Sequence, residues 1–463
     1  MVGEAGSGKT TFLRDLFRKT CSAANNEQTA ALPLLVDAPS LAGIELSELC
    51  ARSLSRAAGT ELGLAAAESL VAERGVTLFI DGLDECRGAD ARAAMLGALD
   101  ALATSPVVRA VVATSRPSEE IAPAGFTTLR LAPFSRQEQI DFLDRYAGAQ
   151  GIGWSGESLL DALPADLREL AGRPLFLALI VTAVAYRGDL PETTDELFDD
   201  YLNVLLGGYA TEEALMVERV LCELAFWCVR ESRVTVPLKK IGEVCERMTD
   251  DMEATELLRR SVLESGVLVP AHGGASFAHL TLMDHLARNY AASIYNFEPS
   301  HSMVQYFLRD PNKIDLMVSS GCVMPTDRVA ELGAGIGSVA RRIPQAKSLT
   351  LVELDERLAT ILRNDFSERQ EVTVHQGDAI AWVAGHDVDV IFSNLPFFLT
   401  DELLDVLAEK EFRVAVVAMP PGHSHDDWED RLRFTHVETN EGGDYFPPQP
   451  VASEVMKVTP RRR

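Results

Sequence analysis

The sequence predicts an α/β protein with two separate parallel sheets, each flanked by helices and joined by a mainly helical stretch. Three observations support this fold class. A glycine-rich phosphate-binding loop opens the chain, an apolar run ending in acidic residues follows it, and a second glycine-rich turn comes directly after a short predicted strand in the C-terminal half. Continuous apolar runs are typical of parallel strands buried on both faces. With 463 residues the chain exceeds one compact core, so we expect several domains.

Composition and charge narrow the class of protein further. Hydrophobic residues make up 47% and charged residues 24% of the chain, as in ordinary globular proteins. The formal net charge is −26, and the part from Ser300 onward carries 17 basic and 26 acidic residues. Such a surface repels phosphate backbones, which disfavours nonspecific nucleic-acid binding but leaves a specific nucleic-acid substrate open.

The cysteines and the hydropathy pattern predict a cytoplasmic protein without a membrane partner. The seven cysteines form no C-x-x-C pair, which favours reduced, buried thiols over a disulfide framework. The longest apolar run, residues 174–186, is too short to cross a bilayer and is expected to form a buried helix. No signal peptide is predicted at the N-terminus.

Residues 3–10 read GEAGSGKT and match the pattern G-x-x-x-x-G-K-[ST] in full. In this pattern the glycines let backbone amides surround a phosphate chain, Lys9 reaches the β- and γ-phosphates, and Thr10 binds Mg²⁺. A helix is predicted over residues 11–20, and its N-terminus adds a favourable dipole. A buried strand is expected before such a loop, whereas only two residues precede it. The predicted nucleotide contacts here are Gly3, Glu4, Ala5, Gly6, Ser7, Gly8, Lys9, Thr10 and Thr11.

Two strand ends complete the predicted triphosphate site. Residues 76–80 form an apolar run that ends at Asp81, where a carboxylate can hold the hydration shell of Mg²⁺. Asp84 or Glu85 can polarise the attacking water, although a solvated loop is the alternative for both. A third strand, residues 107–113, ends in TSRP, whose polar groups can sense the γ-phosphate. The predicted catalytic residues are Asp81, Asp84 and Glu85, and Arg116 is a further predicted nucleotide contact.

Four segments together resemble the NACHT family of signal-transduction ATPases: FIDGLDE at 79–85, LAPFS at 131–135, GRPL at 172–175 and FAHLT at 277–281. The resemblance covers about residues 1–293. It implies that the nucleotide is ATP, that hydrolysis is slow, and that the bound nucleotide reports an on or off state to a fused effector. Nucleotide-dependent self-association is expected with it.

The same resemblance implies domain boundaries and two further ATP contacts. It places a nucleotide-binding core at residues 1–126, a helical domain at 127–205, and a winged-helix-like domain, with a wing near 267–277, at 206–295. In related switch ATPases the positions of Pro174 and His279 contact the nucleotide. His279 can equally be a packed residue of the winged-helix-like domain.

A second glycine-rich turn begins the C-terminal pattern. Residues 328–332 are predicted to form a short buried strand that continues into GAGIG, and a helix is expected to follow. Gly333 and Gly335 permit a tight turn and the close approach of a ligand to the backbone. The next strand, residues 348–352, ends at Glu353, twenty residues after Gly333. This spacing is typical of a carboxylate that binds ribose hydroxyls.

Two further strand ends carry polar groups suited to an adenine. One leads to Asp378, whose carboxylate can accept a hydrogen bond from an adenine amine. The other leads to SNLPF, where the Asn394 side chain and the backbone carbonyl next to Pro396 can both accept from an exocyclic amine. These bonds keep the nitrogen lone pair out of the ring and aim it at a methyl sulfonium, while Phe397 stacks on a flipped-out base. A plain strand-to-turn connection is the alternative.

Several segments in order resemble the ribosomal RNA adenine dimethylase family: QYFLRDP at 305–311, ELGAG at 331–335, ELD at 353–355, GDA at 377–379, NLPF at 394–397 and the tail YFPPQPVAS at 445–453. The resemblance implies a Rossmann-like class I methyltransferase domain at residues 302–463, after a linker at 296–301. It also implies S-adenosylmethionine as cofactor and RNA as methyl acceptor. The implied cofactor contacts are Tyr306, Leu308, Glu331, Gly333, Gly335, Glu353, Asp378, Ala379 and Asn394, and the implied catalytic residues are Asn394, Pro396 and Phe397.

The chain departs from this family after the strand predicted at residues 414–418. Family members usually carry Gln-Lys-Glu where residues 419–423 read MPPGH, and no counterpart of the family's helical RNA-binding domain is expected. Ribosomal RNA is therefore a less secure substrate than the family suggests. The side chains of His423, His425, Asp426 and Asp427 are of metal-binding types, but we expect a solvated loop.

Three functions remain open on the sequence. In the first, the ATPase module gates a working adenine-directed methyltransferase. In the second, the C-terminal domain binds cofactor without transferring a methyl group and serves as a sensor or scaffold. In the third, the chain is mainly a switch ATPase that self-associates. Retention of Asn394, Pro396 and Phe397 together favours real transfer chemistry over cofactor binding alone.

Overall fold

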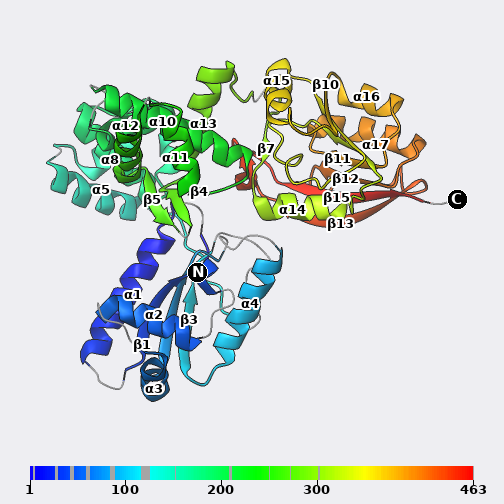
Figure 1. The fold of residues 1–463 in the computed structure, drawn as a ribbon. Coiled ribbons are helices and arrows are strands. Elements are labelled where there is room, and N and C mark those ends of the chain that lie inside the picture. Colours follow the sequence, from blue (N-terminus) through cyan, green and yellow to red (C-terminus); the bar gives the residue numbers. More distant parts are fainter. Residues whose placement is uncertain are drawn as a thin grey trace. The chain divides into compact units, whose positions relative to one another are not determined.

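The computed structural model describes the chain except residues 4–5, 27–29, 42–45, 59–62, 84–88, 116–125, 152, 208–210, 250, 272, 301–302 and 462–463. The chain divides into two compact units, Met1–Gly208 and Tyr209–Arg463 (Figure 1). Each unit has its own sheet and its own buried core.

The first unit begins with a parallel sheet in the order β1-β2-β3, formed by β1 (Leu32–Asp37), β2 (Val76–Asp81) and β3 (Val108–Ala113). Helices α1 (Lys9–Asn26), α2 (Leu46–Ala58) and α4 (Ala89–Thr104) contact this sheet, and α3 (Leu64–Arg74) packs on α2. Leu78 and Ile80 of β2 are fully buried, as the continuous apolar run predicts.

Val2 extends this sheet beyond β3. It forms parallel bridges with Ser115 on one side and Arg130 on the other, and its amide donates to the carbonyl of Leu129. The short segment before the phosphate-binding loop therefore has the position that a preceding strand takes in the expected fold. The loop then leads directly into α1, where the sequence predicts a helix.

The rest of the first unit is helical: α5 (Arg136–Gln150), α6 (Gly156–Ala162), α7 (Ala165–Leu170), α8 (Pro174–Arg187) and α9 (Thr194–Leu205). Ser135 and Glu138 form a capping box that starts α5. The run predicted to be a buried helix is α8, which begins at a proline, buries seven of its residues and ends at Gly188 in the left-handed region.

The second unit opens with a mainly helical part, here named the α10–α13 segment (residues 211–295). Its helices are α10 (Glu212–Arg230), α11 (Leu238–Glu246), α12 (Met252–Glu264) and α13 (Leu280–Tyr295). A small antiparallel sheet in the order β4-β6-β5 accompanies them, formed by β4 (Thr235–Pro237), β5 (Leu268–Ala271) and β6 (Gly274–Phe277). The β5–β6 hairpin lies where the sequence predicts a wing.

A seven-stranded sheet in the order β10-β9-β8-β11-β12-β15-β13 forms the core of residues 303–461, here named the seven-stranded domain (Figure 1). The strands β8 (Arg328–Leu332), β9 (Ser348–Glu353), β10 (Val372–Gln376), β11 (Val390–Ser393) and β12 (Val414–Met419) are parallel, and β15 (Ser453–Pro460) pairs antiparallel with both β12 and β13 (Leu432–Asn440). The chain order reverses between β8 and β11. In open parallel sheets such a switch point marks the crevice where ligands bind.

Four helices and one short strand pair complete this domain: α14 (Pro311–Ser320), α15 (Glu356–Asp365), α16 (Ala379–Gly385), α17 (Thr400–Glu409), and β7 (Phe307–Leu308) paired with β14 (Tyr445–Phe446). The predicted Rossmann-like α/β sheet is therefore confirmed. The predicted proline-rich tail begins at β14 and pairs directly with the segment that carries Phe307 and Leu308.

The helix expected after the second glycine-rich turn was predicted wrongly. Residues 335–343 form successive turns, in which the amides of Arg342 and Ile343 bond three residues back and a single α-type bond runs from Arg341 to Gly337. Pro344 follows at once, and a proline lacks the amide and has the ring that would stop a helix from continuing. The segment is therefore too short to reach regular α-helical bonding.

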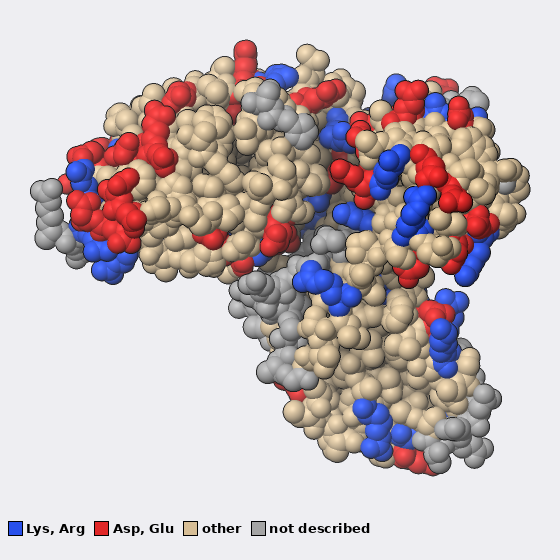
Figure 2. All heavy atoms as spheres, turned by 180° about the vertical axis from the view of Figure 1, so that it is seen from behind, with Lys and Arg blue, Asp and Glu red and all other residues tan. Residues whose placement is uncertain are grey.

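The described cysteines form no disulfide, and four of them are buried, but Cys322 is exposed, contrary to the expectation of uniformly buried thiols. Within the described residues no helix is long and apolar enough to cross a bilayer. Figure 2 shows acidic side chains gathered over the end of the seven-stranded domain that carries α17, on the left of the view. Exposed acids there include Asp401, Glu402, Asp426 and Asp427.

Candidate functional site

The phosphate-binding loop of the first unit has the backbone that its sequence pattern requires. Gly6 and Gly8 have φ angles of 77° and 88°, in the left-handed region that side-chain-bearing residues rarely adopt. The Lys9 ammonium donates to the carbonyl of Gly3 at 2.5 Å, and α1 begins at Lys9. In the described part of the chain, the buried hydroxyl of Ser7 has no hydrogen-bond partner. An unsatisfied donor facing a glycine loop suits an anion such as a phosphate.

The start of α1 and the ends of β2 and β3 meet beside this loop. The Thr10 hydroxyl lies 3.2 Å from Oδ1 of Asp81, and the Thr114 hydroxyl donates to the same oxygen at 2.5 Å. The amide of Gly82 donates to Thr114 at 3.0 Å. A hydroxyl and a carboxylate are oxygen ligands that Mg²⁺ accepts, so the residues present fit this metal.

The GRPL motif lies against the loop. The amide of Leu175 donates to the carbonyl of Gly6 at 3.4 Å, and the Pro174 ring lies 3.9 Å from the position that a Gly8 side chain would take. Thr11 is an exposed residue of α1. His279 belongs to the second unit, at the start of α13, and stays a prediction as an ATP contact. Five predicted residues lie outside the described part of the chain: Glu4, Ala5, Asp84, Glu85 and Arg116.

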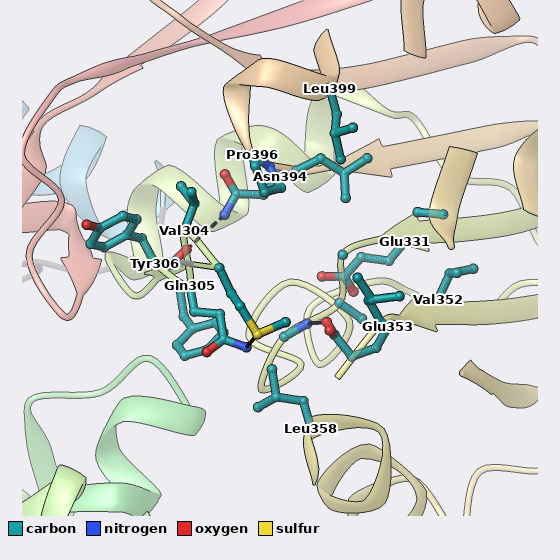
Figure 3. A pocket seen from close by; sticks show the side chains of 18 of the residues that line it. Val304, Gln305, Tyr306, Glu331, Val352, Glu353, Leu358, Asn394, Pro396 and Leu399 are labelled. Atoms are coloured by element: carbon teal, nitrogen blue, oxygen red, sulfur yellow. Dashed lines mark hydrogen bonds between the residues drawn. The ribbon is translucent and has the colours of Figure 1, made fainter. Parts of the chain in front are cut away.

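The seven-stranded domain contains a cavity of about 400 Å³ at the carboxyl ends of β8, β9, β10 and β11 (Figure 3). It lies at the switch point of the sheet, as open α/β sheets lead one to expect. All nine residues predicted to contact the cofactor line it: Tyr306, Leu308, Glu331, Gly333, Gly335, Glu353, Asp378, Ala379 and Asn394. The cavity also includes residues that sequence reasoning missed, among them Met303, Val304, Ser338, Phe398 and Leu399.

Two buried carboxylates lie close together on one wall of the cavity (Figure 3). Glu353 accepts hydrogen bonds from the amides of Gly335 at 2.8 Å and Asp355 at 2.9 Å. Oε2 of Glu331 is buried and has no partner among the described residues. Burial raises the pKa of both carboxyls, well above the usual value for Glu331, where the charge of Arg341 opposes the effect.

The cavity has an acidic lining. Its lining, all within the described residues, includes the carboxylates of Glu331, Glu353 and Asp378 but no Lys or Arg. S-adenosylmethionine has a sulfonium and an ammonium, together with ribose hydroxyls and an adenine amine that donate hydrogen bonds. The unsatisfied oxygen of Glu331 and the exposed carboxylate of Asp378 are suitable acceptors, so the residues present fit this cofactor.

The predicted acceptor side of the cavity carries Asn394 and Pro396 (Figure 3). Nδ2 of Asn394 donates to the carbonyl of Tyr306 at 3.3 Å, which orients the amide and leaves its oxygen as an acceptor. Phe397, predicted to stack on the target base, does not line the cavity. Its neighbour Phe398 does, and it is 75% exposed.

The segment that covers the cavity (residues 303–308) is held by side chains of the QYFLRDP and ELD motifs that were not predicted as cofactor contacts. Nε2 of Gln305 donates to Asp355 at 3.1 Å, and Asp355 forms an ion pair with Arg357 at 2.6 Å. The hydrogen bond from Arg357 lowers the pKa of Asp355 to about 2. The ring of Phe307 lies over Gly335, where a side chain would come within 2.6 Å of it. The ELD motif, through Asp355, thus also holds the segment that covers the cavity.

The histidine loop is only partly solvated. Nε2 of His423 lies 2.8 Å from Asp401, and the His425 ring stacks on Phe434 at 4.1 Å. Both histidines are half-buried, while Asp426 and Asp427 are exposed. The rings therefore pack against the domain, which corrects the expectation of a fully solvated loop.

Comparison with known proteins gives a family for each end of the chain. Residues 1–150 match the family described as NACHT domain, and residues 296–423 match Ribosomal RNA adenine dimethylase. "Probable ribosomal RNA small subunit methyltransferase A" of Methanosarcina mazei is 33% identical over 114 residues, which are 24% of this chain and 42% of that protein. The protein of the same name from Methanosarcina acetivorans is 31% identical over 179 residues, 34% of this chain and 64% of that protein.

The chain thus spans less than two thirds of the length of both relatives. Among solved structures, a dimethyladenosine transferase from Plasmodium falciparum matches 34% of this chain and 63% of that one, with 22% identity and a TM-score of 0.31. A 23S rRNA methyltransferase, ErmE, matches 34% of this chain and 70% of that one, with 21% identity and a TM-score of 0.31.

Proposed function

We propose that this chain, which joins a NACHT domain (residues 1–150) to a ribosomal RNA adenine dimethylase domain (residues 296–423), is an S-adenosylmethionine-dependent adenine N6-methyltransferase under ATP control. The observation that carries the proposal is the convergence of all nine predicted cofactor residues, from several separate segments of the chain, on one cavity at the switch point of the sheet. RNA is the proposed acceptor class.

The residues present suggest how the cofactor is held. Glu331 faces the cationic methionine end, Glu353 the ribose hydroxyls and Asp378 the adenine amine. The bound cofactor supplies a methyl group on a positively charged sulfur. No general acid or metal is needed at this point, because the leaving group is a neutral thioether.

Asn394 and the backbone next to Pro396 act on the acceptor. Hydrogen bonds from the target amine to the Asn394 oxygen and to this backbone carbonyl localise the nitrogen lone pair. An aromatic ring at the entrance, Phe397 or Phe398, stacks on the base. The acidic surface around α17 favours a small, unpaired RNA target over a long duplex with many phosphate contacts.

The first unit is the proposed control element. Lys9 contacts the ATP phosphates, Thr10 and Asp81 hold Mg²⁺, and Pro174 closes on the nucleotide. We propose slow hydrolysis, nucleotide-dependent self-association and a winged-helix role for the α10–α13 segment. Asp84 and Glu85 are the proposed residues that position the attacking water.

Calorimetric titration of S-adenosylmethionine, with and without ATP and Mg²⁺, tests the proposal. We expect binding that is lost in Glu353→Ala and altered by nucleotide. Asn394→Ala should keep cofactor binding while methyl transfer to RNA from labelled cofactor falls to background. Cofactor binding without transfer to any RNA would favour a cofactor sensor, and failure to bind under either condition would reject the methyltransferase.

A further inference from the structure

Arg341 lies in a buried charge network between the α10–α13 segment and the seven-stranded domain. Its side chain is only 12% exposed. Its guanidinium forms an ion pair with Asp365, the last residue of α15, and Nε lies 3.2 Å from Glu231. Arg230 joins the same network through Asp365, at 2.6 Å.

The network includes the C-terminal end of α10. Nη1 of Arg341 donates to the carbonyl of Arg230 at 3.4 Å, and the neighbouring Arg342 donates to the carbonyl of Glu231 at 3.5 Å. Arg230 is the last residue of α10 and Glu231 is its C-cap. Free carbonyls at a helix C-terminus carry partial negative charge, so two cations stabilise this end of α10.

The Arg341 guanidinium also contacts the glycine-rich loop after β8 (residues 333–337). Nη1 of Arg341 donates to the carbonyl of Ile336 at 2.7 Å, and Ile336 lines the cavity. Gly337 has a φ of 79°, and a side chain there would meet Arg341 at 3.0 Å and the Phe366 ring at 2.9 Å. Because only turns follow the loop, no helix fixes its shape. The hydrogen bond from Arg341 to Ile336 therefore helps to fix the shape of the loop.

We propose that Arg341 is a positioning residue for the methyl donor, through which docking of the C-terminus of α10 sets the shape of the glycine-rich loop and hence the affinity for S-adenosylmethionine. This inference rests on the proposed function. It assigns the α10–α13 segment an indirect part in cofactor binding, through Arg341, since no described residue of that segment lines the cavity.

Glu231→Gln in the full chain is the sharpest test. It removes one charge from Arg341 while keeping size, and it lies outside the cavity. We expect the Kd for S-adenosylmethionine to rise at least about fivefold, the lower end of typical coupling between sites. The matched control is Glu223→Gln on the same helix, because Glu223 forms an ion pair with Arg247 inside the α10–α13 segment. This control should leave the Kd within about twofold of wild type.

A double-mutant cycle and hydrogen exchange separate positioning from stability. Arg341→Lys keeps the charge but loses the fork that reaches Ile336 and Glu231 together, so its effect should not add to that of Glu231→Gln. Without ligand, amides of residues 333–343 should exchange faster in Glu231→Gln but not in Glu223→Gln.

Equal Kd changes in the two glutamine variants, or unchanged exchange of the loop in Glu231→Gln, would overturn the inference. The exchange experiment does not depend on cofactor. If wild-type protein binds no S-adenosylmethionine, the proposed function fails, while the exchange result still decides whether α10 orders the loop.

Discussion

The amide of Gly335 donates a 2.8 Å hydrogen bond to Oε2 of Glu353, and this bond joins the loop after β8 to the end of β9. The two strands are parallel neighbours in the sheet, so their carboxyl ends meet at the same edge. The loop is thereby tied to the carboxylate that we propose binds the cofactor ribose. The twenty-residue spacing between Gly333 and Glu353 is the chain length that one crossover of this kind requires.

Charge in the cavity should make the protein distinguish S-adenosylmethionine from its product S-adenosylhomocysteine, whose sulfur is uncharged. Glu331 and Glu353 have pKa values raised above 4.5 by burial, and only the ionised carboxylates attract the sulfonium. The ratio of the two affinities should therefore increase as the pH rises above 4.5. Glu331→Gln should flatten this dependence, measured by calorimetry over a pH series.

The matched control for that experiment is Glu371→Gln, whose carboxylate pairs with Arg369 outside the cavity. It should keep the wild-type pH dependence. If Glu331→Gln also kept it, the buried carboxylate would have no part in recognising the positive charge.

Phe398, rather than Phe397, should be the aromatic residue that the acceptor base contacts first. Phe398 lines the cavity and is 75% exposed, whereas Phe397 does not line it. Stacking on one base is worth about 1–3 kcal/mol, so Phe398→Ala should lower kcat/KM for RNA by roughly 5- to 150-fold. The Kd for S-adenosylmethionine should stay near wild type.

Phe397→Ala is the direct comparison, because it removes the same ring from the next residue. We expect a smaller loss of kcat/KM. A larger loss in Phe397→Ala would show that the NLPF segment rearranges when the acceptor binds, and would return the stacking role to Phe397.

Thr114 should couple the end of β3 to the Mg²⁺ site. Its hydroxyl donates to Oδ1 of Asp81 and accepts from the amide of Gly82. Thr114→Val keeps the shape but leaves that buried amide unsatisfied and Asp81 less fixed, a defect of about 1–3 kcal/mol. We expect ATP hydrolysis to fall about tenfold or more, with a smaller change in ATP affinity.

Thr104→Val provides the control for Thr114→Val, since the exposed Thr104 hydroxyl donates to the carbonyls of Asp100 and Ala101 at the end of α4. Its hydrolysis rate should remain near wild type. Lys9→Ala, which removes the phosphate contact itself, should abolish ATP binding. Equal hydrolysis in Thr114→Val and Thr104→Val would remove Thr114 from the site.

The strands and the acids at their ends could be predicted from sequence because both follow local rules. The sequence predicts strands at β2, β8, β9, β10 and β11, and the polar residues at the end of each strand lie at the carboxyl edge of its sheet. This is why the cofactor residues predicted at strand ends line one cavity: Glu331, Gly333, Gly335, Glu353, Asp378, Ala379 and Asn394. Tyr306 and Leu308, which also line it, were predicted from the family resemblance of the segment 305–311.

Features that depend on long-range contacts could not be predicted in the same way. The turns after Gly337 look helical by composition, but Pro344 stops them and Arg341 is held by α10, more than a hundred residues away. The exposure of Phe398 depends on the short 3₁₀ turn Phe397–Leu399. Neither contact leaves a periodic signal in the sequence.

Asp444 should make the stability of the seven-stranded domain depend on pH. Burial, followed by the charge of Asp310, raises the pKa of this carboxyl from 3.8 to about 6. Between these two values the folded state binds more protons than the unfolded state, so the free energy of unfolding falls as pH rises. The shift corresponds to at most about 3 kcal/mol, lost by pH 6 and constant above it. Asp444→Asn should therefore stabilise the protein near pH 7 and change little near pH 4.

Urea unfolding of the full chain at several pH values measures this effect, followed through the transition that S-adenosylmethionine shifts. Asparagine retains an oxygen that accepts from the amide of Glu441, as Asp444 does at 2.8 Å, so the turn before β14 should persist. Asp427→Asn, at an exposed position, is the control and should leave the pH dependence unchanged. If Asp444→Asn and wild type lost stability in parallel between pH 4 and pH 6, the carboxyl would be ionised in the folded state at its ordinary pKa, and the pH dependence would have to come from other groups.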